Sequence, residues 1–252
     1  MTGFLLIHGS WHGAWCWEDV APILRARGHD VVTPDLPSHG NDRTPAWRTT
    51  LEGYARAIHD AARGMKAPPV VVGHSMGGFA MTEAANRHPG AFAGLIYVCA
   101  FVPEPGETLL GIALADKQST LPSAMARGLV VTRFRKDRAR DCFYATSPEG
   151  RAAAAAERLR PEPMRPALKG ISRPRGPMPP RAYIECLADK AITIGHQRMM
   201  HARAGITQVS QMDTDHSPFY ADPATLADHI CTHATAFAAA DTPKPPLPSG
   251  SA

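Results

Sequence analysis

A glycine-flanked serine directly after a short apolar run constrains this 252-residue chain more than any other stretch. Three valines at 70–72 lead into Gly-His-Ser-Met-Gly-Gly at 73–78, and residues 79–85 have the composition of a helix. A Gly-x-Ser-x-Gly pattern between a strand and a helix is typical of a nucleophile elbow, whose strained turn exposes the serine hydroxyl. Side chains at the flanking glycine positions would collide with neighbouring backbone. The pattern therefore predicts Ser75 as a catalytic nucleophile.

The rest of the chain alternates strand and helix patterns around this turn. Short apolar runs bounded by Gly, Pro or charged residues predict buried strands, and apolar residues at helical spacing predict the helices between them. Strands are expected at 4–7, 29–35, 70–72, 94–100, 181–187 and 207–212, and helices at 17–27, 51–64, 79–85, 197–204 and 223–240. This order predicts an α/β fold with a mostly parallel sheet and helices on both faces.

The composition changes between residues 103 and 180. This segment is rich in Pro, Arg and Ala, with one helix expected at 151–160 and seven prolines at 161–180. We interpret 103–180 as a cap inserted over the C-terminal edge of the sheet, 1–102 and 181–241 as the core domain, and 242–252 as a disordered tail. Residues 127–181 hold 14 Lys and Arg against 5 Asp and Glu. A cap of this charge steers an anionic substrate or forms a solvated arginine face, and the sequence leaves both open.

Composition excludes several classes of protein. Hydrophobic residues make up 44% of the chain and the net charge is +4, so a large core can form and the charge does not indicate a nucleic-acid partner. Five scattered cysteines show no metal-binding spacing, and we expect no metal and reduced, mostly buried thiols. The sequence shows neither a signal-peptide pattern nor a bilayer-spanning apolar run, which predicts a cytoplasmic protein with no membrane partner. The oligomeric state is not predicted, and a homodimer stays open.

Two polar residues complete the predicted site around Ser75. Asp189 and His216 each lie just past a predicted strand. The chain order serine, aspartate, histidine is that of the triad in α/β hydrolases, with His216 as general base and Asp189 fixing its tautomer. Asp213 and Asp215 are competing acids, but they are too close in sequence to His216 to reach the far side of its ring.

The loop after the first strand is rich in Gly, His and Trp. In an elbow site, this loop supplies one backbone N–H to the oxyanion hole and the residue after the nucleophile supplies the other, which predicts Ser10 and Met76 as donors. Trp11 is a candidate for the pocket wall, and His12 is expected to brace the loop. Two polar residues after the second strand are expected to stabilise turns: Asp35 and His39.

Four segments, 8–15, 73–78, 183–189 and 215–217, carry a family resemblance. They resemble the hydroxynitrile lyase and methylesterase branch of the α/β-hydrolase superfamily. The resemblance implies a six-stranded sheet, a small cap, and no metal or cofactor. Lyases of this branch have a threonine and a lysine, which bind cyanohydrin and cyanide, where this chain has Gly9 and Ser217. The resemblance therefore favours an esterase. With Trp11 from the loop, the two compared positions, Gly9 and Ser217, are the expected substrate-binding residues, although Ser217 could instead cap the helix that follows.

Together these features predict a serine hydrolase that cleaves carboxylic esters through an acyl-enzyme. The expected partner is a small-molecule ester, aromatic or polyketide-like, a preference suggested by the basic cap. One alternative is non-hydrolytic chemistry on the same scaffold, either carbon–carbon bond cleavage or cyclisation, with Ser75 only hydrogen-bonding the substrate. Another is a non-catalytic small-ligand binder, which the complete triad argues against because binding needs no activated serine.

Overall fold

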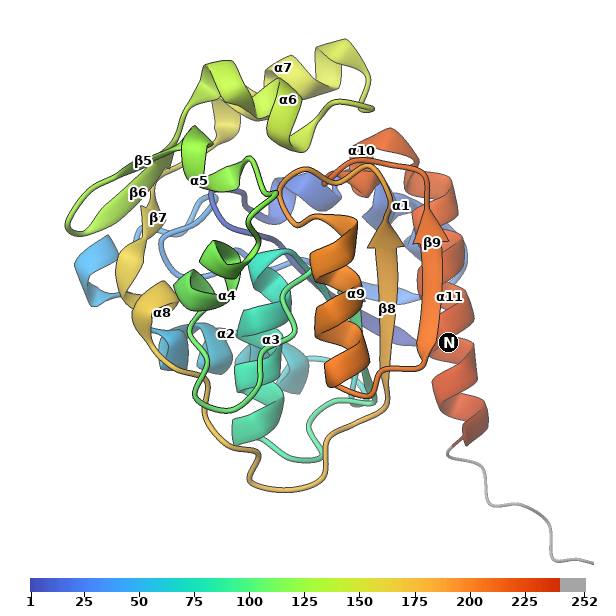
Figure 1. Ribbon diagram of the computed structural model, residues 1–252. Coiled ribbons are helices and arrows are strands. Elements are labelled where there is room, and N and C mark those ends of the chain that lie inside the picture. Colours follow the sequence, from blue (N-terminus) through green and yellow to red (C-terminus); the bar gives the residue numbers. More distant parts are fainter. Residues whose placement is uncertain (241–252) are drawn as a thin grey trace, which may run out of the picture.

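A six-stranded parallel sheet forms the centre of the computed structural model, which describes residues 1–240 (Figure 1). The strand order is β2-β1-β3-β4-β8-β9, and every neighbouring pair is parallel. The fold class expected from the sequence is therefore confirmed. The strands are β1 (Gly3–Ile7), β2 (Asp30–Val32), β3 (Val70–His74), β4 (Gly94–Val98), β8 (Arg181–Cys186) and β9 (Gln208–Met212).

Helices cover both faces of this sheet. Alternate side chains of a strand point to opposite faces, so Phe4 and Leu6 of β1 enter one apolar cluster, and Leu5 and Ile7 enter the other. The first cluster packs against α1 (Val20–Ala26) and α11 (Pro223–Ala240). The second packs against α2 (Leu51–Arg63), α3 (Met76–Arg87) and α9 (Ile194–Arg203).

The expected elements form, but several boundaries differ: α3 and α9 each begin three residues earlier than expected, and β2 ends at Val32 although a strand was expected to reach residue 35. Residues 17–27 were expected to form one helix, but a short 3-10 turn, Ala14–Trp17, precedes α1. The Trp17 side chain is fully buried beneath the loop that follows β1. That buried position, just ahead of Glu18 and Asp19, separates the turn from the helix.

The chain between β4 and β8 contributes no strand to the main sheet. Part of the segment 103–180, which we call the cap, lies above the C-terminal ends of the main-sheet strands, and its last residues return along the core to Arg181, where β8 begins (Figure 1). The expected helix at 151–160 forms as α7, but the three short antiparallel strands of the cap were not anticipated. The elements are α4 (Leu109–Ala115), α5 (Leu121–Ala124), β5 (Met125–Arg127), β6 (Val131–Phe134), a 3-10 turn (Lys136–Arg138), α6 (Ala139–Phe143), α7 (Glu149–Arg158), β7 (Glu162–Pro163) and α8 (Met164–Leu168).

The structure also bears on the cysteines and on the possibility of a membrane-spanning helix. All five cysteines carry free thiols, and Cys231 is the one that is only partly buried. Within residues 1–240, no helix combines the length and the apolar character that crossing a bilayer requires. The predicted tail, 242–252, lies outside the described residues.

Candidate active site

Ser75 occupies a strained turn between the central strand β3 and helix α3. Its backbone has φ 54° and ψ −121°, in the positive-φ region that residues other than glycine rarely adopt. A Cβ at Gly73 would lie 2.8 Å from the carbonyl carbon of Gly77, and a Cβ at Gly77 would lie 2.7 Å from the Ile7 oxygen. Because β1 and α3 approach so closely, the turn accepts only glycine at both flanking positions.

His216 and Asp189 meet at the same edge of the sheet, in the loops after β9 and β8. His216 Nδ1 lies 2.7 Å from Asp189 Oδ2, and both side chains are buried. Since a carboxylate only accepts, Nδ1 carries the proton and Nε2 keeps its lone pair. The Asp189 carboxylate is held in turn by the backbone N–H groups of Ala191 and Ile192, at 2.7 and 2.9 Å from Oδ1. The aspartate is therefore fixed before it orients the imidazole.

The two competing acids lie elsewhere. Asp213 is exposed. Asp215 is buried, but its oxygens accept hydrogen bonds from the N–H of Ser217 at 2.8 Å and from that of Thr146, in the cap, at 2.7 Å. Burial raises the pKa of Asp215 despite these bonds. Its carboxylate thus connects the loop after β9 to the cap and does not contact the His216 ring nitrogens.

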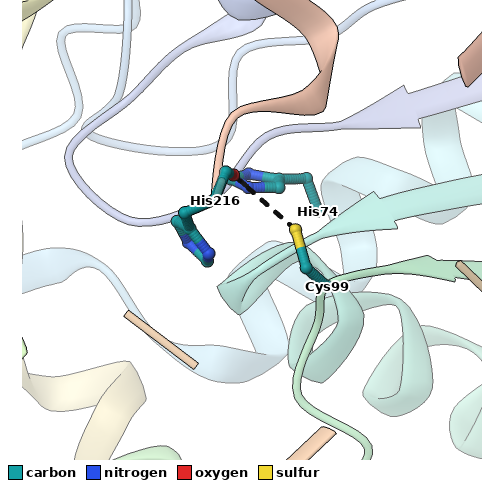
Figure 2. Close-up of side chains that lie close together, drawn as sticks. All are labelled: His74, Cys99 and His216. Carbon is teal, nitrogen blue, oxygen red and sulfur yellow. Dashed lines mark hydrogen bonds between the residues drawn. The ribbon is translucent and has the colours of Figure 1, made fainter. Parts of the chain in front are cut away.

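The backbone carbonyl of His216 receives two buried donors that sequence reasoning missed (Figure 2). His74 Nε2 lies 2.7 Å from this oxygen, and the Cys99 thiol donates to it at 3.6 Å. Burial holds the pKa of His74 well below its usual value, so the ring is neutral. The missed signal was a histidine ending a central strand, a buried position where a ring nitrogen needs a partner.

His74, Cys99 and His216 also lie close enough to raise the question of a metal site. Burial raises the pKa of the Cys99 thiol well above its usual value, so it stays protonated and donates to the carbonyl. A Cβ on Gly9 would lie 2.9 Å from His74 Nδ1, so that nitrogen faces tightly packed backbone. These residues therefore fit a role in holding His216 better than a metal site.

Two backbone N–H groups beside Ser75 are available to an oxyanion. Met76 opens α3 immediately after the serine, and Ser10 lines the same cavity as Ser75. Within residues 1–240, neither N–H donates to another group of the protein. Unpaired N–H groups next to a nucleophile can stabilise negative charge on a carbonyl oxygen, which helps most as the tetrahedral intermediate forms.

The cavity at Ser75 is narrow and almost wholly apolar. Its volume is about 50 Å³, and among residues 1–240 the only charged side chain in its wall is Glu162 of β7. Trp11 lines it, as the sequence suggested. The other wall residues come mainly from the cap: Phe101, Leu109, Leu110, Ala113, Leu121, Met125, Thr132, Met164 and Ala167.

The other two expected substrate-binding residues do not reach this cavity. Gly9 packs against the nucleophile, where an added Cβ would lie 2.8 Å from the Ser75 Cβ. Ser217 is fully buried, and its hydroxyl has no hydrogen-bond partner within residues 1–240. It therefore neither caps α10 (Pro218–Ala221) with its side chain nor lines the pocket. Resemblance assigned both positions by analogy with lyases, and here close packing occupies them.

The basic residues of the cap point mostly away from the cavity. Arg151 pairs with Glu18 at 3.0 Å and with Asp19, and Arg158 also pairs with Glu18 at 3.0 Å. Arg160 donates to the Gly40 carbonyl at 2.6 Å. These contacts connect the cap to the core. Part of the positive charge of the cap is therefore paired with core residues and stabilises the position of the cap.

Comparison with known proteins agrees with this geometry. Residues 4–229 match the alpha/beta hydrolase family model. A pyrethroid hydrolase of Sphingobium wenxiniae is 31% identical, over 94% of this chain and 89% of the relative. Methylesterase 2 of Arabidopsis thaliana is 29% identical, over 93% of this chain and 96% of the relative. The crystal structure of a pyrethroid hydrolase from Sphingobium faniae superposes with a TM-score of 0.83 at 28% identity, covering 94% of this chain and 99% of that one.

The chain belongs to the alpha/beta hydrolase family. Within that family, its relatives are esterases that resemble it over nearly their whole length, as the methylesterase-like motifs had indicated. The protein is accordingly a carboxylic ester hydrolase.

Proposed function

We propose that Ser75, His216 and Asp189 act as the catalytic triad of this ester hydrolase. Ser75 Oγ attacks the acyl carbon while its proton passes to His216 Nε2, and Asp189 stabilises the resulting imidazolium. The N–H groups of Ser10 and Met76 hold the oxyanion. His216 then protonates the departing alkoxide as the acyl–oxygen bond breaks. Water, deprotonated by His216, hydrolyses the acyl-enzyme and restores Ser75. The observation that carries this proposal is the buried 2.7 Å bond between His216 and Asp189, set beside the strained serine turn.

The wall of the cavity favours a neutral, apolar ester over a charged one. No Lys or Arg side chain lines it within the described residues, so a substrate carboxylate would find no unpaired cation there. The large apolar residues of the cap suit an aliphatic or aromatic acyl or alcohol group. The cavity holds only a few water-sized volumes, so the cap or its side chains must move to admit such an ester. Steering of an anionic substrate by the cap is not part of this proposal.

The lyase form of the non-hydrolytic alternative is disfavoured by the side chains that surround His216 in the described part of the chain. Release of cyanide or of a carbanion requires a positive charge near the general base. The rings that pack around His216 are Phe143 and His74, and the latter is neutral. Ester hydrolysis needs no such cation because His216 itself protonates the leaving group.

A labelling and turnover experiment tests the proposal. The protein is treated with a fluorophosphonate and analysed by mass spectrometry, and it is assayed on matched p-nitrophenyl esters of a neutral and of a carboxylate-bearing acid. We expect a single adduct on Ser75, absent in Ser75→Ala, and faster turnover of the neutral ester. Folded protein that takes up no label and turns over no ester would contradict the proposal. Faster turnover of the charged ester would contradict the substrate class alone.

A further inference from the structure

The loop that carries the Ser10 N–H contains an unfavourable backbone conformation, which contacts from other parts of the protein must stabilise. Trp11, the next residue, has φ 61°, in the left-handed region that residues other than glycine rarely occupy. Such a conformation persists only where surrounding contacts impose it. The contacts around Trp11 therefore help to set the position of the neighbouring Ser10 N–H, whose residue lines the same cavity as Ser75.

Two cap residues form hydrogen bonds with the Trp11 backbone, one at its N–H and one at its carbonyl. The Trp11 N–H donates to Glu162 Oε2 at 3.0 Å, and the Trp11 carbonyl accepts from the Arg160 N–H at 2.9 Å. Because Glu162 occupies the Trp11 N–H, the Ser10 N–H is the donor of this loop that remains for an oxyanion. Glu162 opens β7 and Arg160 lies two residues before it, about 150 residues from Trp11 along the chain.

A second cap contact fixes the other end of the same peptide unit. His12 Nδ1 lies 2.8 Å from the Ser10 carbonyl, and His12 Nε2 lies 2.7 Å from the Tyr144 hydroxyl. Burial lowers the pKa of His12 to about 4, so the ring is neutral, donates from Nδ1 and accepts from Tyr144. The Ser10–Trp11 peptide is thus held at its C=O through Tyr144 and at its N–H through Glu162.

The Glu162 carboxylate is itself held by a buried cation. His39 Nε2 lies 2.7 Å from Glu162 Oε2, and His39 Nδ1 lies 3.1 Å from the Pro37 carbonyl. Both neighbours are acceptors, so both ring nitrogens must donate and His39 is an imidazolium. Burial alone would lower the pKa of His39, but the charge and hydrogen bond of Glu162 outweigh burial and raise it. His39 therefore does more than stabilise its own turn, because it neutralises a carboxylate that would otherwise be buried unpaired.

We propose that Glu162 is a positioning residue that couples closure of the cap to assembly of the oxyanion hole. When β7 sits on the core, Glu162 and Arg160 hold Trp11 and leave the Ser10 N–H directed at the substrate. When the cap opens to admit an ester, these contacts break and the loop relaxes. The enzyme then reaches full activity only with the cap closed over bound substrate. This inference rests on the proposed ester hydrolysis at Ser75.

Two variants of Glu162 and one control in the same cap test the coupling. Glu162→Gln keeps the shape and an acceptor oxygen but loses the ion pair with His39, and Glu162→Ala removes both. The control is Glu157→Ala, which removes an exposed cap carboxylate paired with Lys136 at 2.6 Å. We expect kcat on a p-nitrophenyl ester to fall about 10- to 100-fold in Glu162→Ala, which approaches the loss of one oxyanion donor, and less in Glu162→Gln. KM should change by less than about threefold, and Glu157→Ala should match the wild type.

Hydrogen exchange gives a second readout that does not depend on turnover. The peptide containing residues 9–12 should exchange faster in both Glu162 variants than in the wild type, while the peptide over β3 should not change. Unchanged loop exchange, a change in KM without a change in kcat, or an equal loss in Glu157→Ala would each overturn the coupling. If Glu162→Ala fails to fold, Glu162→Gln carries the same test. Wild-type protein that turns over no ester would contradict the proposed function, whereas the exchange result bears on the contacts of Glu162 alone.

Discussion

The two halves of this active site are built by different means. On the core side, three loops that follow parallel strands place Ser75, Asp189 and His216 at one edge of the sheet. On the cap side, short helices and two- to four-residue strands reach the same site through single polar contacts, such as that from Glu162. Under the mechanism that we propose, the sheet sets where the chemistry occurs, whereas the cap sets what can enter and when the oxyanion loop is in order.

The largest expected effect lies on the core side, at the triad acid. Asp189→Asn should lower kcat by about 10³- to 10⁴-fold, because the amide no longer holds the imidazole in the tautomer that accepts the serine proton. The measurement is steady-state hydrolysis of a p-nitrophenyl ester by folded variant protein. Asp215→Asn is the matched control, since its carboxylate binds the cap at Thr146, and its kcat should fall by less than about tenfold. An equal loss of kcat in the two variants would contradict the distinction between the core side and the cap side of the site.

A smaller loss of activity is expected when the buried hydrogen bond between His74 of β3 and the His216 carbonyl is removed. His74→Ala leaves the His216 carbonyl with only the weak Cys99 donor, so kcat should fall about tenfold and the free energy of unfolding by about 1–3 kcal/mol. Activity assays and urea titration measure the two losses. His74→Gln, whose amide can donate to the same carbonyl, should recover part of each. An unchanged kcat in His74→Ala would show that this bond does not position the general base.

The junction between core loop and cap should respond to pH through His12. Its pKa is about 4 when folded against 6.5 when unfolded, so the unfolded chain binds a proton first and stability falls as the pH drops from about 6.5 towards 4. Between about pH 7 and pH 5 this one group should lower the free energy of unfolding by about 2 kcal/mol. Urea titrations of wild type and His12→Gln at both pH values measure the difference. Identical pH dependence in the two proteins would contradict a buried neutral His12.

The smallest effect belongs to the exposed ion pairs that tie cap to core. Arg151→Ala removes contacts with Glu18 and Asp19 at half-exposed positions, which should cost less than about 1 kcal/mol of stability and less still in high salt. Hydrolysis of a carboxylate-bearing ester, however slow, should keep its kcat/KM at low and at high salt. A strong salt dependence of that ratio would revive electrostatic steering by the cap.

The difference between the halves also explains what the sequence could predict. The core signals are local, since the glycine-flanked serine directly follows the three valines and each of the two polar residues lies within a few residues of the strand before it. Ser75, Asp189 and His216 could be chosen on that basis, and the structure brings Asp189 and His216 together. The cap contacts are not local, because Glu162 and its partner His39 are separated by 123 residues in the chain. Nothing in the composition around Glu162 marks it, and only the folded chain brings it to Trp11.

The measurement that tests the central claim most directly is capture of the acyl-enzyme. Wild-type protein is mixed with an excess of p-nitrophenyl ester, quenched in acid within the first turnovers, digested, and examined by mass spectrometry. The triad predicts a peptide containing Ser75 that is heavier by one acyl group, with no other peptide modified. Rapid turnover of the ester without acyl on Ser75, or with acyl on another residue, would contradict the account.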